Sequence, residues 1–114
     1  MSKVFVTNAW GHDVAPDILV SNVSKPIEVD EVIPITKGMI DKYDAAFMLE
    51  CCNEVLSSAK AEDFLILTGP ALLQCFAVSY MLNKFGEVHI LQFVKGKYKV
   101  RDLVPTKTNE LVIQ

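Results

Sequence analysis

The chain has 114 residues, of which 51% are hydrophobic and 22% are charged, and its formal net charge is −3. This length is typical of one domain, and the apolar content excludes a disordered chain because burial of apolar surface offsets the entropy lost on folding. The negative net charge also argues against bulk electrostatic binding of DNA. We therefore expect a single folded domain over residues 1–114, with 105–114 as a possible tail.

The apolar segments are too short to cross a membrane. The longest, residues 70–82, is interrupted by polar residues and falls short of the ~20 residues that a spanning helix needs. No secretory signal is visible. Cys51, Cys52 and Cys75 are odd in number and form no Cys-x-x-Cys metal motif. We therefore expect three small core residues in a protein of the reducing cytoplasm.

The first part of the chain predicts two strands. Residues 3–8 are rich in β-branched and aromatic residues and predict a short buried strand. Residues 9–16 predict a loop, and residues 17–23 fit either a strand or a helical turn. Residues 29–36 predict a second strand. We place it at a sheet edge because Pro34 has no N–H to donate to a neighbouring strand.

The middle of the chain predicts a helix and a buried strand. Apolar residues recur every three or four positions between residues 40 and 59, which is typical of an amphipathic helix. Thr36 or Gly38 would cap its start. Residues 63–68 contain four consecutive apolar residues, which predicts a strand that is covered on both faces.

The last part of the chain predicts a helix followed by a hairpin. Residues 71–84 predict the helix, which Gly86 would end. Residues 87–94 and 97–104 predict two antiparallel strands joined by a tight turn, and residues 106–114 fit a weak strand or a loose tail. Because strands alternate with helices, we predict a small three-layer, Rossmann-like α/β sandwich with a mostly parallel sheet and a C-terminal antiparallel hairpin.

Three predicted strands end in similar residues, and in an open parallel sheet ligands bind beyond these carboxyl ends. Glycine lets the backbone approach a ligand, a helix start attracts anions, and Lys37 adds a positive charge. We therefore predict a site for a phosphate-bearing small molecule, although the same residues also fit helix caps and turns. No Gly-x-Gly-x-x-Gly or phosphate-loop motif is present, which disfavours dinucleotide redox chemistry and triphosphate hydrolysis. The candidate ligand-binding residues are Asn8, Trp10, Gly11, His12, Asp13, Thr36, Lys37, Gly38, Thr68, Gly69 and Pro70.

His12 is the candidate catalytic residue, because histidine exchanges protons near neutral pH. Trp10 beside it suits stacking on a nucleobase. The alternative is that Gly-His-Asp forms a turn with its own backbone hydrogen bonds. His89 lies in an apolar strand, so we expect a partnered core or interface histidine. Neither a serine-nucleophile motif nor a metal-ligand spacing is present, and we predict no cofactor.

Two further patterns concern surfaces. Lys95, Lys97, Lys99 and Arg101 alternate and would share one face of the final strand. This stripe fits either an anion or nucleic-acid contact, or protection of a sheet edge against pairing. Residues 71–82 are apolar almost all round, which indicates a homodimer packed through the second helix. The predicted contact residues are Leu72, Leu73, Phe76 and Tyr80.

Short segments resemble known families. The run Gly69-Pro70-x-x-Leu73-x-Cys75-Phe76, followed by a strand and a hairpin, resembles the small CRISPR-associated ring nucleases that bind cyclic tetra-adenylate. Residues 3–8 are similar to the start of the small viral anti-CRISPR ring nucleases. The chain also resembles uncharacterised phage proteins that begin with a strand and a Gly-His-Asp-like loop. Each match covers a third of the chain or less.

The resemblance implies a dimeric, Rossmann-like protein that binds a cyclic oligonucleotide defence signal at the strand ends. Gly69 and Pro70 match the binding turn, whereas Gln74 and Ser79 stand where the CRISPR-associated family carries its cleavage histidines. Our leading hypothesis is therefore binding, for sequestration or sensing. The alternatives are a metal-independent phosphodiesterase that uses His12 as general acid, and a non-enzymatic homo-oligomeric interaction protein.

Overall fold

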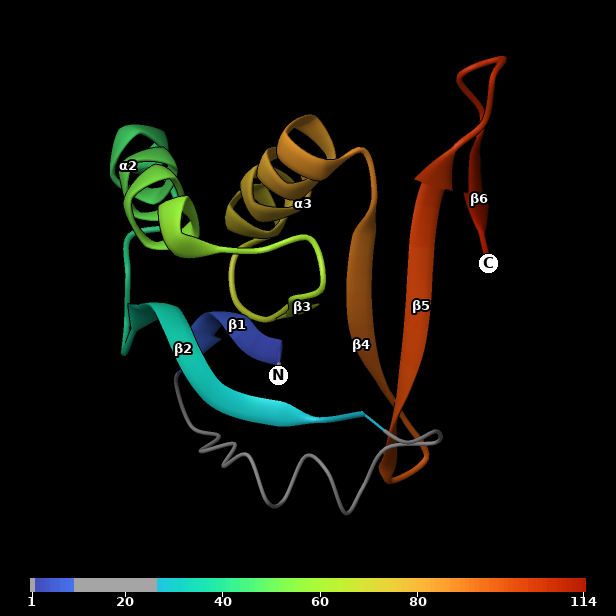
Figure 1. The fold of residues 1–114 in the computed structure, drawn as a ribbon. Coiled ribbons are helices and arrows are strands. Elements are labelled where there is room, and N and C mark those ends of the chain that lie inside the picture. The colour runs from blue at the N-terminus through green and yellow to red at the C-terminus, as the bar shows by residue number, and fades with distance from the viewer. Residues whose placement is uncertain (1, 10–26) are drawn as a thin grey trace.

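The computed structural model describes residues 2–9 and 27–114, and in this part of the chain six strands form one mixed sheet in the order β2-β1-β3-β4-β5-β6 (Figure 1). The sheet is parallel from β2 to β4 and antiparallel from β4 to β6. The α/β class and the C-terminal antiparallel hairpin are thus confirmed. The strands are β1 (Ser2–Ala9), β2 (Val29–Lys37), β3 (Phe64–Ile66), β4 (Val88–Val94), β5 (Lys97–Pro105) and β6 (Leu111–Ile113), and the helices are α2 (Ala45–Val55), the 3-10 turn η1 (Leu56–Ser58) and α3 (Ala71–Phe85).

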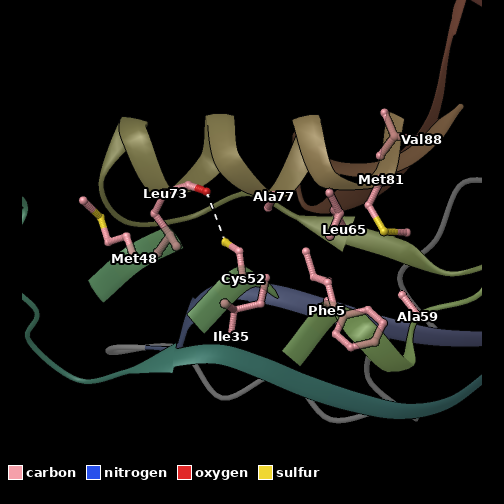
Figure 2. Packing of buried hydrophobic residues seen from close by; sticks show 11 residues of the cluster. Phe5, Ile35, Met48, Cys52, Ala59, Leu65, Leu73, Ala77, Met81 and Val88 are labelled. Atoms are coloured by element: carbon pink, nitrogen blue, oxygen red, sulfur yellow. Dashed lines mark hydrogen bonds between the residues drawn. The ribbon is translucent and has the colours of Figure 1, made fainter. Parts of the chain in front are cut away.

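Helices α2 and α3 lie on the same face of the sheet (Figure 1). Helix α2 connects β2 to β3 across β1, and α3 connects β3 to β4. Between the helices and the strands lies the main core, in which Phe5 and Leu65 meet Leu73 and Met81 (Figure 2). Burial of this apolar surface supplies most of the free energy of folding. Neither α2 nor α3 is long and apolar enough to cross a membrane.

Helix α2 begins at Ala45, later than the apolar spacing predicted. The side chain of Asp44 caps it by accepting a hydrogen bond from the N–H of Phe47 at 3.0 Å. A carboxylate at this position satisfies an N–H of the first turn and interacts favourably with the helix dipole. The prediction of a cap at Thr36 or Gly38 is therefore wrong. The residues just before Asp44 form a loop instead.

Other predicted boundaries are confirmed. Among the described strands, β2, which contains Pro34, lies at one edge of the sheet. Helix α3 ends at Gly86, whose φ of 75° is a left-handed conformation that glycine adopts without strain. The possible C-terminal tail is partly a strand, because residues 111–113 pair with the end of β5.

Helix α3 buries most of its apolar surface within the monomer. Leu73 is fully buried in the main core, while Phe76 and Tyr80 are half-buried against it. Helix α2 packs beside α3 and supplies cover that the sequence alone did not reveal. The assignment of Leu73 to a dimer contact is therefore wrong, and self-association through Leu72, Phe76 and Tyr80 stays a prediction.

The three cysteines occupy three different environments. Cys52 is buried in the main core, with its Sγ atom 4.0 Å from the carbonyl oxygen of Leu73 (Figure 2). Burial raises the pKa of the Cys52 thiol to about 11, so that thiol stays protonated at neutral pH. Cys51 is half-buried and Cys75 is exposed. The prediction of a core residue is confirmed for Cys52 and wrong for Cys75.

The sheet face turned away from the helices carries a second buried cluster, and His89 lies beside it. The His89 Nδ1 atom is 2.7 Å from Oδ1 of Asp102 on the neighbouring strand, and its Nε2 atom is 3.5 Å from Oε1 of Glu87. The His89 ring also lies 5.9 Å from that of Phe64. His89 is therefore a partnered histidine, as predicted. The buried residues of this second cluster are Val4, Val6, Val29, Phe64, Ile66 and Leu91.

The basic stripe is shorter than predicted. Lys95 has a φ of 50° in the turn before β5, so only Lys97, Lys99 and Arg101 alternate along that strand. β5 is not the final strand, because β6 pairs with its last three residues, Leu103–Pro105. Among the described residues, the segment with the basic side chains therefore forms an open sheet edge. This position fits protection of the edge by lysine and arginine.

Candidate functional site

Buried polar side chains join the carboxyl ends of β1 and β2. The Asn8 amide donates hydrogen bonds to Oγ1 of Thr36 at 2.9 Å and to the carbonyl oxygen of Gly38 at 3.1 Å. The Thr36 hydroxyl donates in turn to the carbonyl oxygen of Thr7 at 2.8 Å. Thr7, Asn8 and Thr36 are all more than nine-tenths buried. Buried polar groups are stable only when they are hydrogen-bonded, so this network fixes the geometry of the two strand ends.

A second set of hydrogen bonds joins β1 to the segment after β3. The Thr68 hydroxyl donates to the carbonyl oxygen of Asn8 at 2.6 Å and accepts from the Asn8 N–H at 3.1 Å. The Thr68 N–H donates to Oγ1 of Thr7 at 2.6 Å, and the Thr7 hydroxyl donates to the Thr68 carbonyl oxygen. The hydroxyls of Thr36 and Thr68 thus bind the protein itself. Both residues therefore hold the strand ends in place.

Gly69 brings the start of α3 close to Asn8. Its φ is 80°, and a Cβ atom at this position would lie 2.6 Å from the Asn8 Cβ atom. Only glycine fits there, because any side chain would meet both backbone strain and this contact. Pro70 precedes α3, and none of the side chains in the described part of the chain caps this helix. The first N–H groups of α3 therefore offer hydrogen bonds and a positive dipole end to an anion.

A pocket of about 450 Å³ opens at these strand ends. Its walls are the end of β1, the loop between β2 and α2, and the turn before α3. Most of the lining is apolar. The apolar spacing predicts a helix that includes residues 40–43, whereas these residues form a loop that lines the pocket. In the described part of the chain, the lining residues are Asn8, Gly38, Met39, Ile40, Asp41, Lys42, Tyr43, Gly69 and Pro70.

The loop before α2 carries an aromatic ring and two opposite charges at the rim of the pocket. Tyr43 is 83% exposed and Met39 is 78% exposed, so both offer apolar surface to a ligand. The Asp41 carboxylate accepts a hydrogen bond from the Tyr43 N–H at 2.9 Å, which fixes the turn. The Lys42 Nζ atom lies 5.3 Å from the centre of the Tyr43 ring, within the range of a cation–π contact.

The predicted site residues fall into four groups. Thr36 and Thr68 hold the strand ends through hydrogen bonds and are not among the residues that line the pocket. Asn8, Gly38, Gly69 and Pro70 line the pocket. Lys37 is exposed at the end of β2 and is not part of the lining. Within residues 2–9 and 27–114, no cluster of His, Cys, Asp and Glu side chains has the geometry of a metal site. The predicted residues that lie outside the described part of the chain are Trp10, Gly11, His12 and Asp13.

Comparisons with protein-family models, with curated proteins and with solved structures found no match for this chain. The resemblance to ring nucleases therefore stays a prediction. Evidence about function comes from the geometry of the strand ends.

Proposed function

We propose that the pocket at the strand ends binds a small molecule of the nucleotide class through a phosphate group. The observation that carries this proposal is a pocket of about 450 Å³ beside the start of α3, a helix that no side chain of residues 2–9 or 27–114 caps. Pockets of roughly 300–1,000 Å³ with a mostly apolar lining and few polar groups are typical of small-molecule sites. The carboxyl end of a parallel sheet is also the usual position of such a site in α/β proteins.

The charges around the pocket favour one orientation of the ligand. Phosphate belongs next to Gly69 and Pro70, where the N–H groups of α3 begin. Asp41 lies in the loop before α2 and repels an anion, so this wall suits the neutral part of the ligand. Tyr43 offers a ring on which a nucleobase stacks, and Lys42 supplies a positive charge to the phosphate.

A pocket of this volume suits one nucleotide unit. The finer proposal is that the ligand is a cyclic oligonucleotide signal. Such a ring would bind either with one of its nucleotide units in the pocket of one chain, or between two copies of the chain that surround the same ring. Phosphodiesterase activity on that signal depends on His12 and is a separate proposal. Product formation that persists in a His12→Ala variant would remove His12 from any such mechanism.

Binding is tested by calorimetry and thermal unfolding with a panel of adenosine monophosphate, cyclic mononucleotides, cyclic tetra-adenylate and inorganic phosphate. A ligand at 100 times its dissociation constant adds about 2.7 kcal/mol to the free energy of unfolding. We expect Lys42→Ala and Tyr43→Ala to weaken binding. Lys60→Ala is the matched control, because Lys60 is exposed and precedes β3 at the opposite end of the sheet. The proposal fails if no panel member binds at millimolar concentration, or if the two pocket variants bind as the wild type does.

We also propose the three-layer, Rossmann-like form of the fold. The support is the second buried cluster, in which Val4 is fully buried and Leu91 is 2% exposed on the face that α2 and α3 do not cover. A third layer on this face predicts nuclear Overhauser contacts from the Val4 and Leu91 methyl groups to residues outside the sheet. Contacts to residues of the sheet alone would contradict the three-layer fold.

A further inference from the structure

We propose that β6 pairs with β6 of a second copy of this chain, antiparallel around a two-fold axis at Val112, so that one sheet runs through both copies. Among the described residues, β6 has β5 as its sole neighbour. Leu111 is 57% exposed and Ile113 is 65% exposed. Residues 111–113 contain neither a charge nor a proline. The unpaired N–H and C=O groups along an open strand edge are a template for pairing with another strand.

The hydrogen bonds of β6 show which backbone groups are available. The N–H of Gln114 donates to the carbonyl oxygen of Asp102 on β5 at 2.9 Å. In an antiparallel pair, backbone groups point alternately toward one neighbour and away from it. Val112 therefore directs its N–H and C=O toward β5, as Gln114 does. Leu111 and Ile113 direct theirs to the open edge.

A two-fold axis at Val112 uses these outward groups fully. It places Leu111 opposite Ile113 of the partner subunit, and Ile113 opposite Leu111 of the partner subunit. Each of these two pairs exchanges two N–H···O=C hydrogen bonds, because both members point outward. The same register brings apolar side chains together in both pairs. Such an interface is isologous, since one surface contacts its own copy.

The charges near β6 are compatible with this register, and they distinguish β6 from β2 at the other edge of the sheet. With the axis at Val112, Glu110 lies opposite the partner's Gln114, so no like-charged side chains meet. The other edge, β2, carries exposed Asp30 and Glu31 together with Pro34, which discourage pairing. The open segment of β5 carries Lys97, Lys99 and Arg101, which also discourage pairing. Among the described strands, β6 is therefore the edge that suits self-pairing.

The size of the contact sets the expected affinity. A strand of three residues buries far less than the roughly 1,600 Å² of a standard protein–protein interface. We therefore expect a weak dimer that forms with rising protein concentration. This contact is independent of α3 and of the ligand pocket.

Sedimentation velocity from micromolar to millimolar concentration tests the proposal. The wild type is expected to shift from monomer to dimer, whereas Leu111→Lys stays monomeric with an unchanged midpoint of urea unfolding. Leu49→Lys is the matched control, because Leu49 is 44% exposed on α2 and far from β6 in the sheet order. A wild type that remains monomeric, or a control that loses the dimer equally, overturns the proposal.

Amide hydrogen exchange tests the register itself. The Val112 N–H bonds to β5 within one copy, so its protection is expected at every concentration. Protection of the Leu111 and Ile113 amides is expected to rise as the dimer forms. A dimer in which these two amides exchange as fast as in the monomer refutes the β6 register.

Discussion

Replacement of Gly69 by alanine tests how the turn before α3 is built. The residue has a φ of 80°, and an added Cβ atom would lie 2.6 Å from the Asn8 Cβ atom. A non-glycine residue in the left-handed region costs roughly 1–2 kcal/mol. The contact adds to this cost because the Asn8 Cβ atom belongs to a strand and cannot rotate away. Asn8 is also held by its amide hydrogen bonds to Thr36 and Gly38.

The two costs are separable because the chain contains a matched glycine. Gly86 has a φ of 75°, and an added Cβ atom there meets nothing within 4 Å. Gly86→Ala is therefore expected to lower the free energy of unfolding by about 1 kcal/mol, through backbone strain alone. Gly69→Ala is expected to lower it by about 2–4 kcal/mol, because overpacking adds roughly 1–3 kcal/mol to the backbone cost.

Urea unfolding followed by circular dichroism measures both changes, with the slope against urea as a check on two-state behaviour. A double-mutant cycle with Asn8→Gly removes the contacting Cβ atom. The penalty of Gly69→Ala is expected to be smaller in the Asn8→Gly background than in the wild type. If Gly69→Ala costs no more than Gly86→Ala, or if the cycle shows no coupling, the close approach does not explain this glycine.

Four further predictions compare buried with exposed groups. Thr36→Val is expected to lower the free energy of unfolding by about 1–3 kcal/mol, measured in urea, because a buried amide loses its acceptor. The pKa of Cys52 is raised from its ordinary value of 9.0 to about 11 in the folded protein, so the unfolded chain loses this proton first as pH rises. The contribution of Cys52 to the free energy of unfolding is therefore complete below about pH 9 and falls as pH rises toward 11. The stability difference between wild type and Cys52→Ala is expected to shrink over that range. A thiol reagent is expected to modify exposed Cys75 before Cys52. Leu73→Ala is expected to cost about 2–5 kcal/mol and Leu72→Ala under about 1, as only Leu73 is fully buried.

The candidate site was predictable in part. Asn8, Gly69 and Pro70 were identified because glycine, proline and strand-ending polar residues have local conformational preferences. The loop with Lys42 and Tyr43 was missed because its apolar residues continue the periodicity of the helix that follows. The aspartates of that loop were a usable signal, since Asp44 stands three residues before Phe47 and suits an N-cap.

The sequence by itself determined the order of the elements, the buried strand β3, the edge position of β2 and the end of α3 at Gly86. These features depend on interactions between residues near each other in the chain, such as hydrophobic periodicity, proline geometry and glycine at positive φ. The tertiary structure alone decided which apolar residues of α3 are covered, where the threonine hydroxyls bond, and which strand forms the second open edge. Each of these depends on contacts between segments far apart in the chain, and local patterns do not encode their partners.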